Sequence, residues 1–189
     1  MAIRFRTPTL SAFATLILSA SAANATPLEE CRNLSAKPAI PQCTLVIDDG
    51  RENPGNRSYA HLLRARAEMD LSELESAQAD IAAALVVQPG NPFAYRLRAR
   101  LRDLQNRPAE ARADYTTALH LSEAPAQQYL AYLERGQFFA RIKQYRDALA
   151  DLDAAIRLDG SRRRPMSVVR SSIARWATSM RRSRASVGP

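Results

Sequence analysis

Apolar positions recur through the middle of the chain at the spacing of amphipathic helices. Several lie three or four residues apart, which places them on one face of a helix whose other positions are polar. They include Leu63, Ala67, Ile81, Ala84 and Leu85. Polar breaks rich in proline and glycine, as at 89–92, separate such segments, and no proline falls at the centre of a predicted helix between residues 58 and 160. The pattern predicts an all-α domain of short helices in succession.

The same order of residue types occurs three times along this helical region. The first copy has a ring at His61 and small residues at Ala65, Ala77 and Ala84, with bulky Ile81 between the last two. The second copy has Tyr95, Ala99, Ala111, Tyr115 and Ala118, and the third has Tyr132, Gly136, Ala148, Leu152 and Ala155. The copies are 34 and then 37 residues apart. A unit of this length cannot bury its apolar face alone, so the repeat predicts a stacked array.

These aligned residues resemble the tetratricopeptide repeat (TPR) family, whose helix-turn-helix units stack into a solenoid. The resemblance covers about residues 58 to 160, with a partial unit before it. It implies three repeats, at residues 58–91, 92–125 and 126–162. The tyrosine that the family usually has in the first helix is replaced by Glu68, Arg102 and Phe139.

The first 25 residues have the three-part pattern of a secretory signal peptide. Arg4 and Arg6 give a basic start, residues 10–20 are apolar, and residues 23–25 fit the small-x-small rule for cleavage. The alternative is a membrane anchor, for which the apolar run is short against ~30 Å of hydrocarbon. We expect cleavage near Ala25 and a periplasmic or secreted product.

Residues 26–57 are expected to form an N-terminal cap followed by a polar linker. Ala39, Cys43 and Val46 have the spacing of a second repeat helix, so half a repeat is expected to pack on the first full repeat. Cys31 and Cys43 are the two cysteines of the chain. An even count in an exported protein favours a disulfide, with a reduced pair as the alternative. Two cysteines without a nearby histidine are too few to bind zinc, and no metal site is expected.

Charge is distributed unevenly between the repeats and the ends of the chain. From residue 26 to 159 there are 17 Lys and Arg against 19 Asp and Glu, whereas eight arginines and no acid follow. The repeat body is therefore not expected to bind nucleic acid. In the basic segment 163–189, apolar residues recur at helical spacing: Met166, Val169, Ile173, Trp176 and Met180. A helix that caps the solenoid is expected there, with a basic helix on an anionic membrane or a disordered tail as alternatives.

The TPR resemblance also implies a binding surface, because the first helices of TPR proteins line a concave groove that holds peptides or partner proteins. The implied positions are Tyr59, Leu62, Arg66 and Met69, then Phe93, Arg96, Arg100 and Leu104, and finally Leu130, Leu133, Gln137 and Arg141. Arginine holds carboxylates with two parallel hydrogen bonds. We therefore expect a partner with an acidic or C-terminal carboxylate segment. The alternative is that these arginines are ordinary solvated charges.

Recognisable catalytic motifs are absent from the sequence, which contains no nucleophile elbow, phosphate-binding glycine loop or zinc-binding helix motif. The acidic residues Asp147, Asp151 and Asp153 are expected on the solvated outer face of a helix. No cofactor is expected. The sequence favours a non-catalytic interaction scaffold of the periplasm or cell envelope over an enzyme. A second hypothesis is a binder of envelope surfaces or polyanions that acts through the arginine-rich tail.

Overall fold

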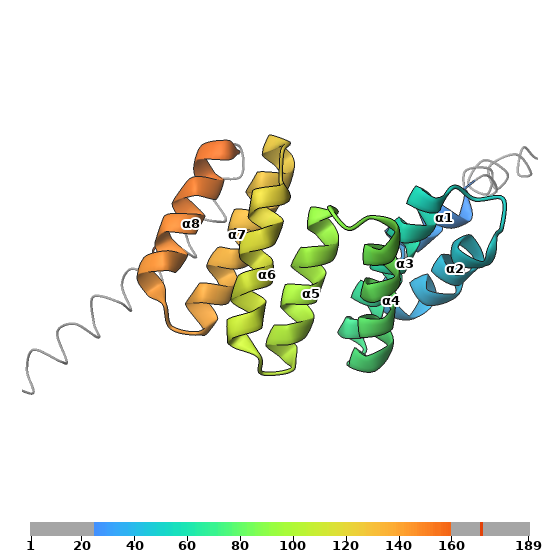
Figure 1. Cartoon of the computed structure of the whole chain (residues 1–189), viewed down its shortest axis with the longest axis horizontal. Coiled ribbons are helices and arrows are strands. Elements are labelled where there is room, and N and C mark those ends of the chain that lie inside the picture. The colour runs from blue at the N-terminus through green and yellow to red at the C-terminus, as the bar shows by residue number, and fades with distance from the viewer. Residues whose placement is uncertain (1–24, 160–170, 172–189) are drawn as a thin grey trace, which may run out of the picture.

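The computed structural model describes residues 25–159 and Ser171, and this part of the chain is a row of α-helices without strands. The helices are α1 (Pro27–Asn33), α2 (Ala36–Asp48), α3 (Pro54–Asp70), α4 (Leu74–Val87), α5 (Pro92–Leu104), α6 (Pro108–Leu121), α7 (Pro125–Arg141) and α8 (Tyr145–Leu158). Figure 1 shows them side by side, with α1 and α2 at one end and α8 at the other. The stacked all-α architecture expected from the repeat is confirmed. The expected signal peptide and C-terminal segment lie outside the described residues, apart from Ala25 and Ser171.

Small residues bring the two helices of each repeat close together. Ala65 and Ala77 in the first repeat, and Ala99 and Ala111 in the second, have no exposed surface. In the third repeat, a Cβ added to Gly136 would lie 3.3 Å from the carbonyl oxygen of Ala148 and 3.1 Å from Leu152. Larger side chains at these crossings would push the backbones beyond the usual 8–10 Å of packed helices.

The turns inside the three repeats share one backbone geometry. Ser72, Asn106 and Lys143 are in the left-handed region, with φ of 65°, 58° and 64°. The amide of the next residue then donates to a carbonyl five residues earlier, at 2.8 Å in all three turns. This hydrogen bond satisfies a carbonyl at the end of the first helix. The turn lets the second helix run back along the first.

The N-terminal cap packs on the first repeat as predicted. Ala39, Cys43 and Val46 on α2 are buried against α3, and a disulfide joins Cys31 on α1 to Cys43. The cap is a pair of helices, because α1 precedes α2, where the sequence suggested half a repeat. Helix α3 begins at Pro54 and so includes residues 54–57, which were expected to belong to the linker.

A bidentate ion pair with a buried aspartate joins the two helices of every repeat. In each copy an arginine donates two hydrogen bonds to an aspartate sixteen residues later. The pairs are Arg64–Asp80 (2.6 and 2.7 Å), Arg98–Asp114 (2.9 and 2.8 Å) and Arg135–Asp151 (2.7 and 2.9 Å). The aspartate side chains are 7%, 4% and 8% exposed. The expectation that Asp151 lies on the solvated outer face was therefore wrong. Its ion pair with Arg135 places it between the two helices of the repeat.

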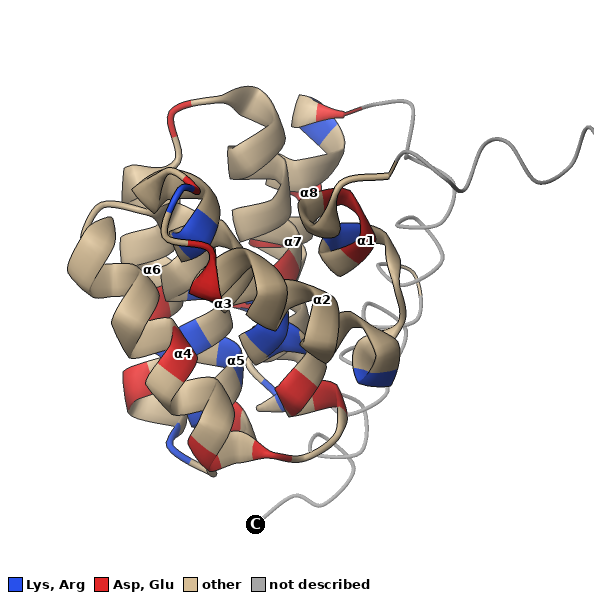
Figure 2. Ribbon diagram, turned by 90° about the vertical axis from the view of Figure 1, so that its right-hand side faces the viewer, with Lys and Arg blue, Asp and Glu red and all other residues tan. Residues whose placement is uncertain are grey.

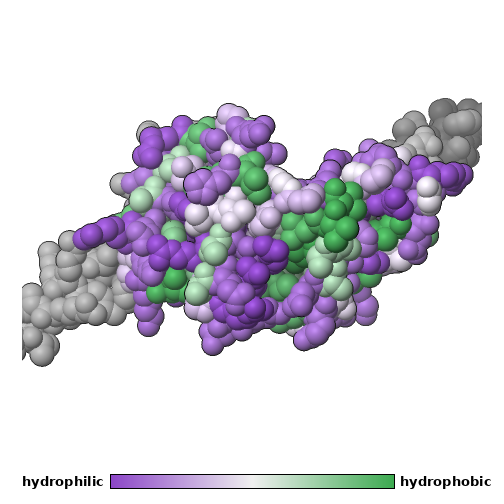
Figure 3. Space-filling model, in the orientation of Figure 1, coloured by the Kyte–Doolittle hydropathy of each residue, from purple (hydrophilic) through white to green (hydrophobic). Residues whose placement is uncertain are grey.

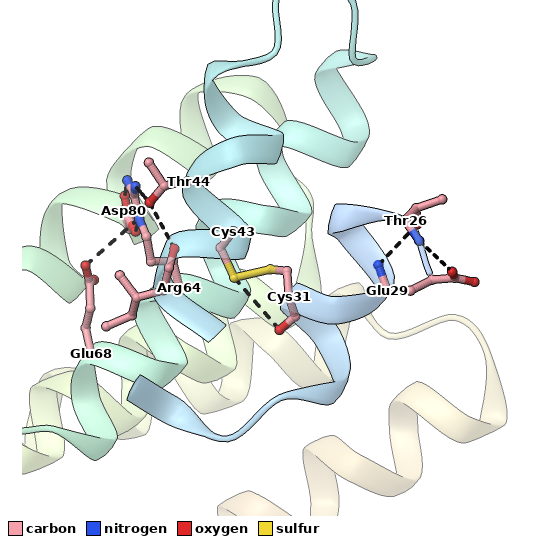
Figure 4. Close-up of a disulfide and its surroundings, with 9 residues drawn as sticks. Thr26, Glu29, Cys31, Cys43, Thr44, Arg64, Glu68 and Asp80 are labelled. Atoms are coloured by element: carbon pink, nitrogen blue, oxygen red, sulfur yellow. Dashed lines mark hydrogen bonds and ion pairs between the residues drawn. A yellow bond between two sulfur atoms is a disulfide. The ribbon is translucent and has the colours of Figure 1, made fainter. Parts of the chain in front are cut away.

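In the first repeat this ion pair also holds the cap. Arg64 donates to the hydroxyl of Thr44 on α2 at 2.9 Å (Figure 4). His61 Nδ1 lies 2.9 Å from the Asp80 carboxylate. Burial alone would raise the pKa of Asp80, but the hydrogen bonds from Arg64 and His61 outweigh it and lower the pKa.

Glu68 is a second carboxylate beside this ion pair. Its Oε1 lies 4.0 Å from Arg64 Nε, while its Oε2 is buried without a hydrogen bond among the described residues. Burial, together with the negative charge of Asp80, raises the pKa of Glu68 to about 7. At the same position the second repeat has Arg102, which pairs with Asp114 at 2.6 Å. The first repeat therefore holds a carboxylate where the second holds a cation.

Glu68 makes the stability of the fold depend on pH. Its folded pKa of about 7 lies above the ordinary value of 4.5, so the native state binds this proton more tightly than the unfolded state. Its contribution to the free energy of unfolding therefore falls as pH rises from 4.5 to 7, by about 1–3 kcal/mol, and is constant above that range. We expect Glu68→Gln to be more stable than wild type at pH 8 and similar at pH 4.5, as measured by urea unfolding. The control, Glu75→Gln at an exposed site on α4, should follow wild type. Parallel pH profiles for wild type and Glu68→Gln would contradict the assignment.

Candidate partner-binding groove

The first helices of the three repeats line a groove of about 660 Å³. Helix α3 contributes one lining residue, Arg66, and α6 contributes one, Tyr115. Helices α5 and α7 contribute the others. The lining residues are Arg66, Phe93, Arg96, Leu97, Arg100, Asp103, Leu104, Tyr115, Leu130, Glu134, Gln137, Phe138 and Arg141. Below, "the groove" means the space lined by these residues.

Most of the positions implied by the sequence line this groove. They are Arg66, Phe93, Arg96, Arg100, Leu104, Leu130, Gln137 and Arg141. Tyr59 lies outside it and packs on Phe93, with the ring centres 6.1 Å apart. Leu62 and Met69, which are 0% and 4% exposed, belong to the core instead. Leu133 packs on the core cluster of the third repeat. The placement of Leu62 and Met69 on the binding surface was therefore wrong, because those positions of α3 face the core.

Three of the four groove arginines already pair with carboxylates of the chain itself. Each pair links neighbouring first helices, α3 to α5 or α5 to α7. The pairs are Arg100–Asp70 (2.7 Å), Arg96–Glu134 (3.1 Å) and Arg141–Asp103. A partner's carboxylate would have to compete with these internal acids. The expected cluster of arginines free for an acidic segment is therefore reduced to one residue.

Arg96 is the most deeply placed of these arginines. It is 7% exposed, and its guanidinium lies 5.3 Å from the centre of the Phe93 ring. Burial raises the pKa of Glu134, while the positive charges of Arg96 and Arg100 act against that rise. The sequence reasoning missed Glu134. The signal was present, because Glu134 is four residues after Leu130 and three before Gln137, which places all three on one helix face.

Arg66 differs from the other groove arginines. Among the residues that the structure describes, it makes no ion pair or hydrogen bond, and it is partly exposed. The four groove arginines face three carboxylates, Asp70, Asp103 and Glu134. One positive charge therefore remains for a ligand, and it lies at Arg66 on the α3 side.

The floor of the groove is apolar. Phe138 and Tyr115 are 1% and 5% exposed, and their ring centres lie 5.3 Å apart. Burial raises the pKa of Tyr115, so its phenol stays neutral. Leu104 is 49% exposed at the edge of the groove, and Gln137 is exposed as well. The arrangement suits an apolar side chain, with an amide and one cation available for polar groups.

The rest of the described surface carries mixed charge and a further hollow. Figure 2 shows acidic and basic positions interspersed over the helices, rather than one sign gathered on a face. A hydrophobic area appears around the seam of α4 and α5 in Figure 3. There a hollow of about 240 Å³ has Ile81, Leu85 and Leu101 among its lining residues, and Val86 nearby on α4 is 82% exposed.

Features of metal centres and membrane spans do not occur within residues 25–159. No group of three or more His, Cys, Asp or Glu side chains in this part of the chain could hold a metal ion. None of its helices is both long enough and apolar enough to span a membrane.

Comparison with known proteins identifies the fold. No protein-family model and no curated protein matches the chain. Among solved structures, the Arabidopsis OM64 TPR domain is 20% identical, with a TM-score of 0.55, covering 65% of this chain and 98% of that one. TTC0263, a TPR protein of Thermus thermophilus, is 18% identical, with a TM-score of 0.58, covering 74% and 73%. The first TPR of Spaghetti (RPAP3), bound to the HSP90 peptide SRMEEVD, is 15% identical, with a TM-score of 0.57, covering 66% and 98%. The protein has the TPR solenoid fold.

The different depths of the groove ion pairs predict different effects on stability. Arg96→Ala leaves Glu134 without its partner and removes a buried side chain, so we expect a loss of about 1–3 kcal/mol in the free energy of unfolding. Arg100→Ala breaks a pair whose side chains are 45% and 44% exposed, and should lower stability by about 1 kcal/mol or less. Urea unfolding at pH 7 measures both. Equal losses would show that depth does not set the strength of these pairs.

Proposed function

We propose that the protein is a non-catalytic scaffold that binds a segment of a partner protein or peptide in the groove. The observation that carries this proposal is the groove itself, which has an apolar floor, an exposed amide at Gln137 and, at Arg66, a cation without a partner among the described residues. A concave site that combines apolar area with a few polar groups is the usual form of a binding site. The proposed site comprises Arg66, Phe93, Arg96, Arg100, Gln137 and Arg141, with Tyr59 as a flanking residue.

The charges of the groove residues limit the chemistry of the partner segment. The RPAP3 structure holds a peptide that contains acidic residues, and the fold of the present protein supports a similar mode of binding. Here, however, internal carboxylates neutralise three of the four groove arginines. The proposed partner therefore presents an apolar side chain for the floor and a single carboxylate, from an acidic residue or a C-terminus, for Arg66. A run of several acids would meet Asp70, Asp103 and Glu134.

We propose a periplasmic or secreted location for the mature protein. The support is the pattern of a secretory signal in residues 1–25, together with the disulfide between Cys31 and Cys43. Disulfides persist mainly in oxidising compartments. The N-terminal residue of the protein purified from its native cells tests this part of the proposal. A start near Thr26 is expected, and retention of residues 1–25 would contradict it.

Site-specific photocrosslinking tests the groove. A photoreactive amino acid at Gln137, which is exposed in the groove, is compared with the same residue at Ala113, which is exposed on α6 outside the groove lining. The full chain is expressed in the native organism. We expect a discrete adduct from position 137 and none of that size from position 113. Equal labelling from both positions, or labelling from 113 alone, would place the partner elsewhere.

A further inference from the structure

The hollow of about 240 Å³ at the seam of α4 and α5 is separate from the groove. The two share no lining residue. On α5, residues 98, 101, 102 and 105 line the hollow and share one face of the helix, whereas the groove residues lie on another. The principal walls are Gln78, Ile81 and Leu85 on α4, with Arg98, Leu101 and Arg102 on α5. Below, "the seam hollow" means this space.

The third repeat has an aromatic ring at the corresponding place. Phe139 on α7 has the repeat position that Arg102 has on α5. Its side chain is 5% exposed, and its ring centre lies 5.6 Å from the guanidinium of Arg112 and 5.7 Å from that of Arg135. Since Arg112 belongs to α6, this ring fills the seam between the second and third repeats.

The residues that would flank such a ring are both present at the seam hollow. Gln78 on α4 has the repeat position of Arg112, and Arg98 on α5 has that of Arg135. Arg102 stands at the position of the ring itself, and it pairs with carboxylates of α6. The seam hollow therefore lies where the third repeat has its ring.

The contacts of the two equivalent arginines show the same difference. Arg135 lies near two rings, that of Tyr132 at 5.8 Å and that of Phe139 at 5.7 Å. Among the described residues, Arg98 lies near one ring, that of Tyr95, at 4.8 Å. A guanidinium group is attracted to the face of an aromatic ring. Arg98 therefore has the chemistry to bind a second ring.

The size of the seam hollow indicates a single side chain rather than a whole small molecule. Sites for drug-sized ligands usually enclose roughly 300–1,000 Å³, which is more than the volume of about 240 Å³ found here. Ile81, Leu85 and Leu101 give it apolar walls. The apolar surface extends to the exposed Val86, which follows Leu85 on α4 (Figure 3).

The charged residues at the seam hollow leave an excess of one positive charge. Three of its lining residues are arginines, Arg98, Arg102 and Arg107. They pair with two carboxylates, Asp114 and Glu110. An acidic residue beside the aromatic one would be attracted. The segment of this chain after residue 159 has eight arginines and no acid, so its charge does not suit this site.

We propose that the seam hollow is a second binding site, which takes an aromatic side chain from an acidic segment of a partner protein. The ring enters between α4 and α5 and contacts Leu101 and Arg98. It completes this seam in the way that Phe139 completes the next one from within the chain. The site lies apart from the groove, so its test does not depend on the function proposed for the groove.

NMR spectroscopy of the full chain with three tripeptides tests the site. Each peptide is acetylated and amidated. The first has phenylalanine between two glutamates, the second has alanine between two glutamates, and the third has phenylalanine between two lysines. We expect the first peptide to shift the methyl resonances of Ile81, Leu85 and Leu101 in a saturable way, because the bound ring lies against them. The other two peptides should each bind at least about fivefold more weakly.

Variants that fill the seam hollow should block this binding. Arg102→Phe supplies a ring from the chain itself, as in the third repeat, while Arg98 still has its two hydrogen bonds to Asp114. Ala82→Phe fills the space from the exposed α4 side, and it keeps the test open if the first variant does not fold. Each folded variant should bind the first peptide at least about tenfold more weakly. The matched control Arg146→Phe, at an exposed position of α8, should bind it like wild type.

Three results would overturn the proposal. One is equal binding of the alanine and phenylalanine peptides flanked by glutamate, which would mean that charge alone attracts them. Another is unchanged binding by the folded variants Arg102→Phe and Ala82→Phe, which would place the peptide elsewhere. The third is a shift of the Leu101 methyl resonances without peptide, either when the protein concentration is raised or when the chain is stopped after Gly160. The first of these changes would make a second copy the occupant, and the other would make it the C-terminal segment of the chain itself.

Discussion

The two helices of each repeat pack close together. They can do so only because alanine or glycine stands at each crossing, as at Ala65 against Ala77 and Gly136 against Ala148. When each repeat closes in this way, its first helix lies beside the first helix of the next repeat. Helices α3, α5 and α7 then share one surface, and the groove follows from their alignment.

Two sets of ion pairs have different roles in this array of helices. The buried Arg–Asp pairs lie within repeats and fix how the two helices meet, and in the first repeat Arg64 extends this to the cap through Thr44. Removing one member of such a pair is expected to destabilise the fold, because it leaves the other charge without its partner. The groove pairs lie between repeats and neutralise most of its charge. We therefore propose that recognition of a partner depends on the apolar floor and Arg66.

The repeated helix pairs could be predicted from the sequence, whereas the partners of the charged residues could not. A small residue recurs at Ala77, Ala111 and Ala148, because only a small side chain fits where two helices cross. This recurrence was enough to define the helix pairs. The Arg–Asp spacing of sixteen residues repeats just as regularly, but the partner of a charged residue depends on which helices meet, so Asp151 was misplaced. Glu134 was missed as well, although its spacing from Leu130 and Gln137 places it on the groove face of α7. The left-handed turns at Ser72 and Lys143 could not be predicted, because neither position is a glycine.

We propose that Arg66, rather than the internally paired arginines, binds the partner's carboxylate. The direct measurement is the affinity of the crosslinked partner for wild type and for two matched neutral variants, Arg66→Gln and Arg100→Gln, by calorimetry at moderate ionic strength. We expect the affinity to fall about tenfold or more for Arg66→Gln, equal to about 1.4 kcal/mol, and by less than about threefold for Arg100→Gln. The reverse order, with Arg100→Gln the more damaging change, would contradict it.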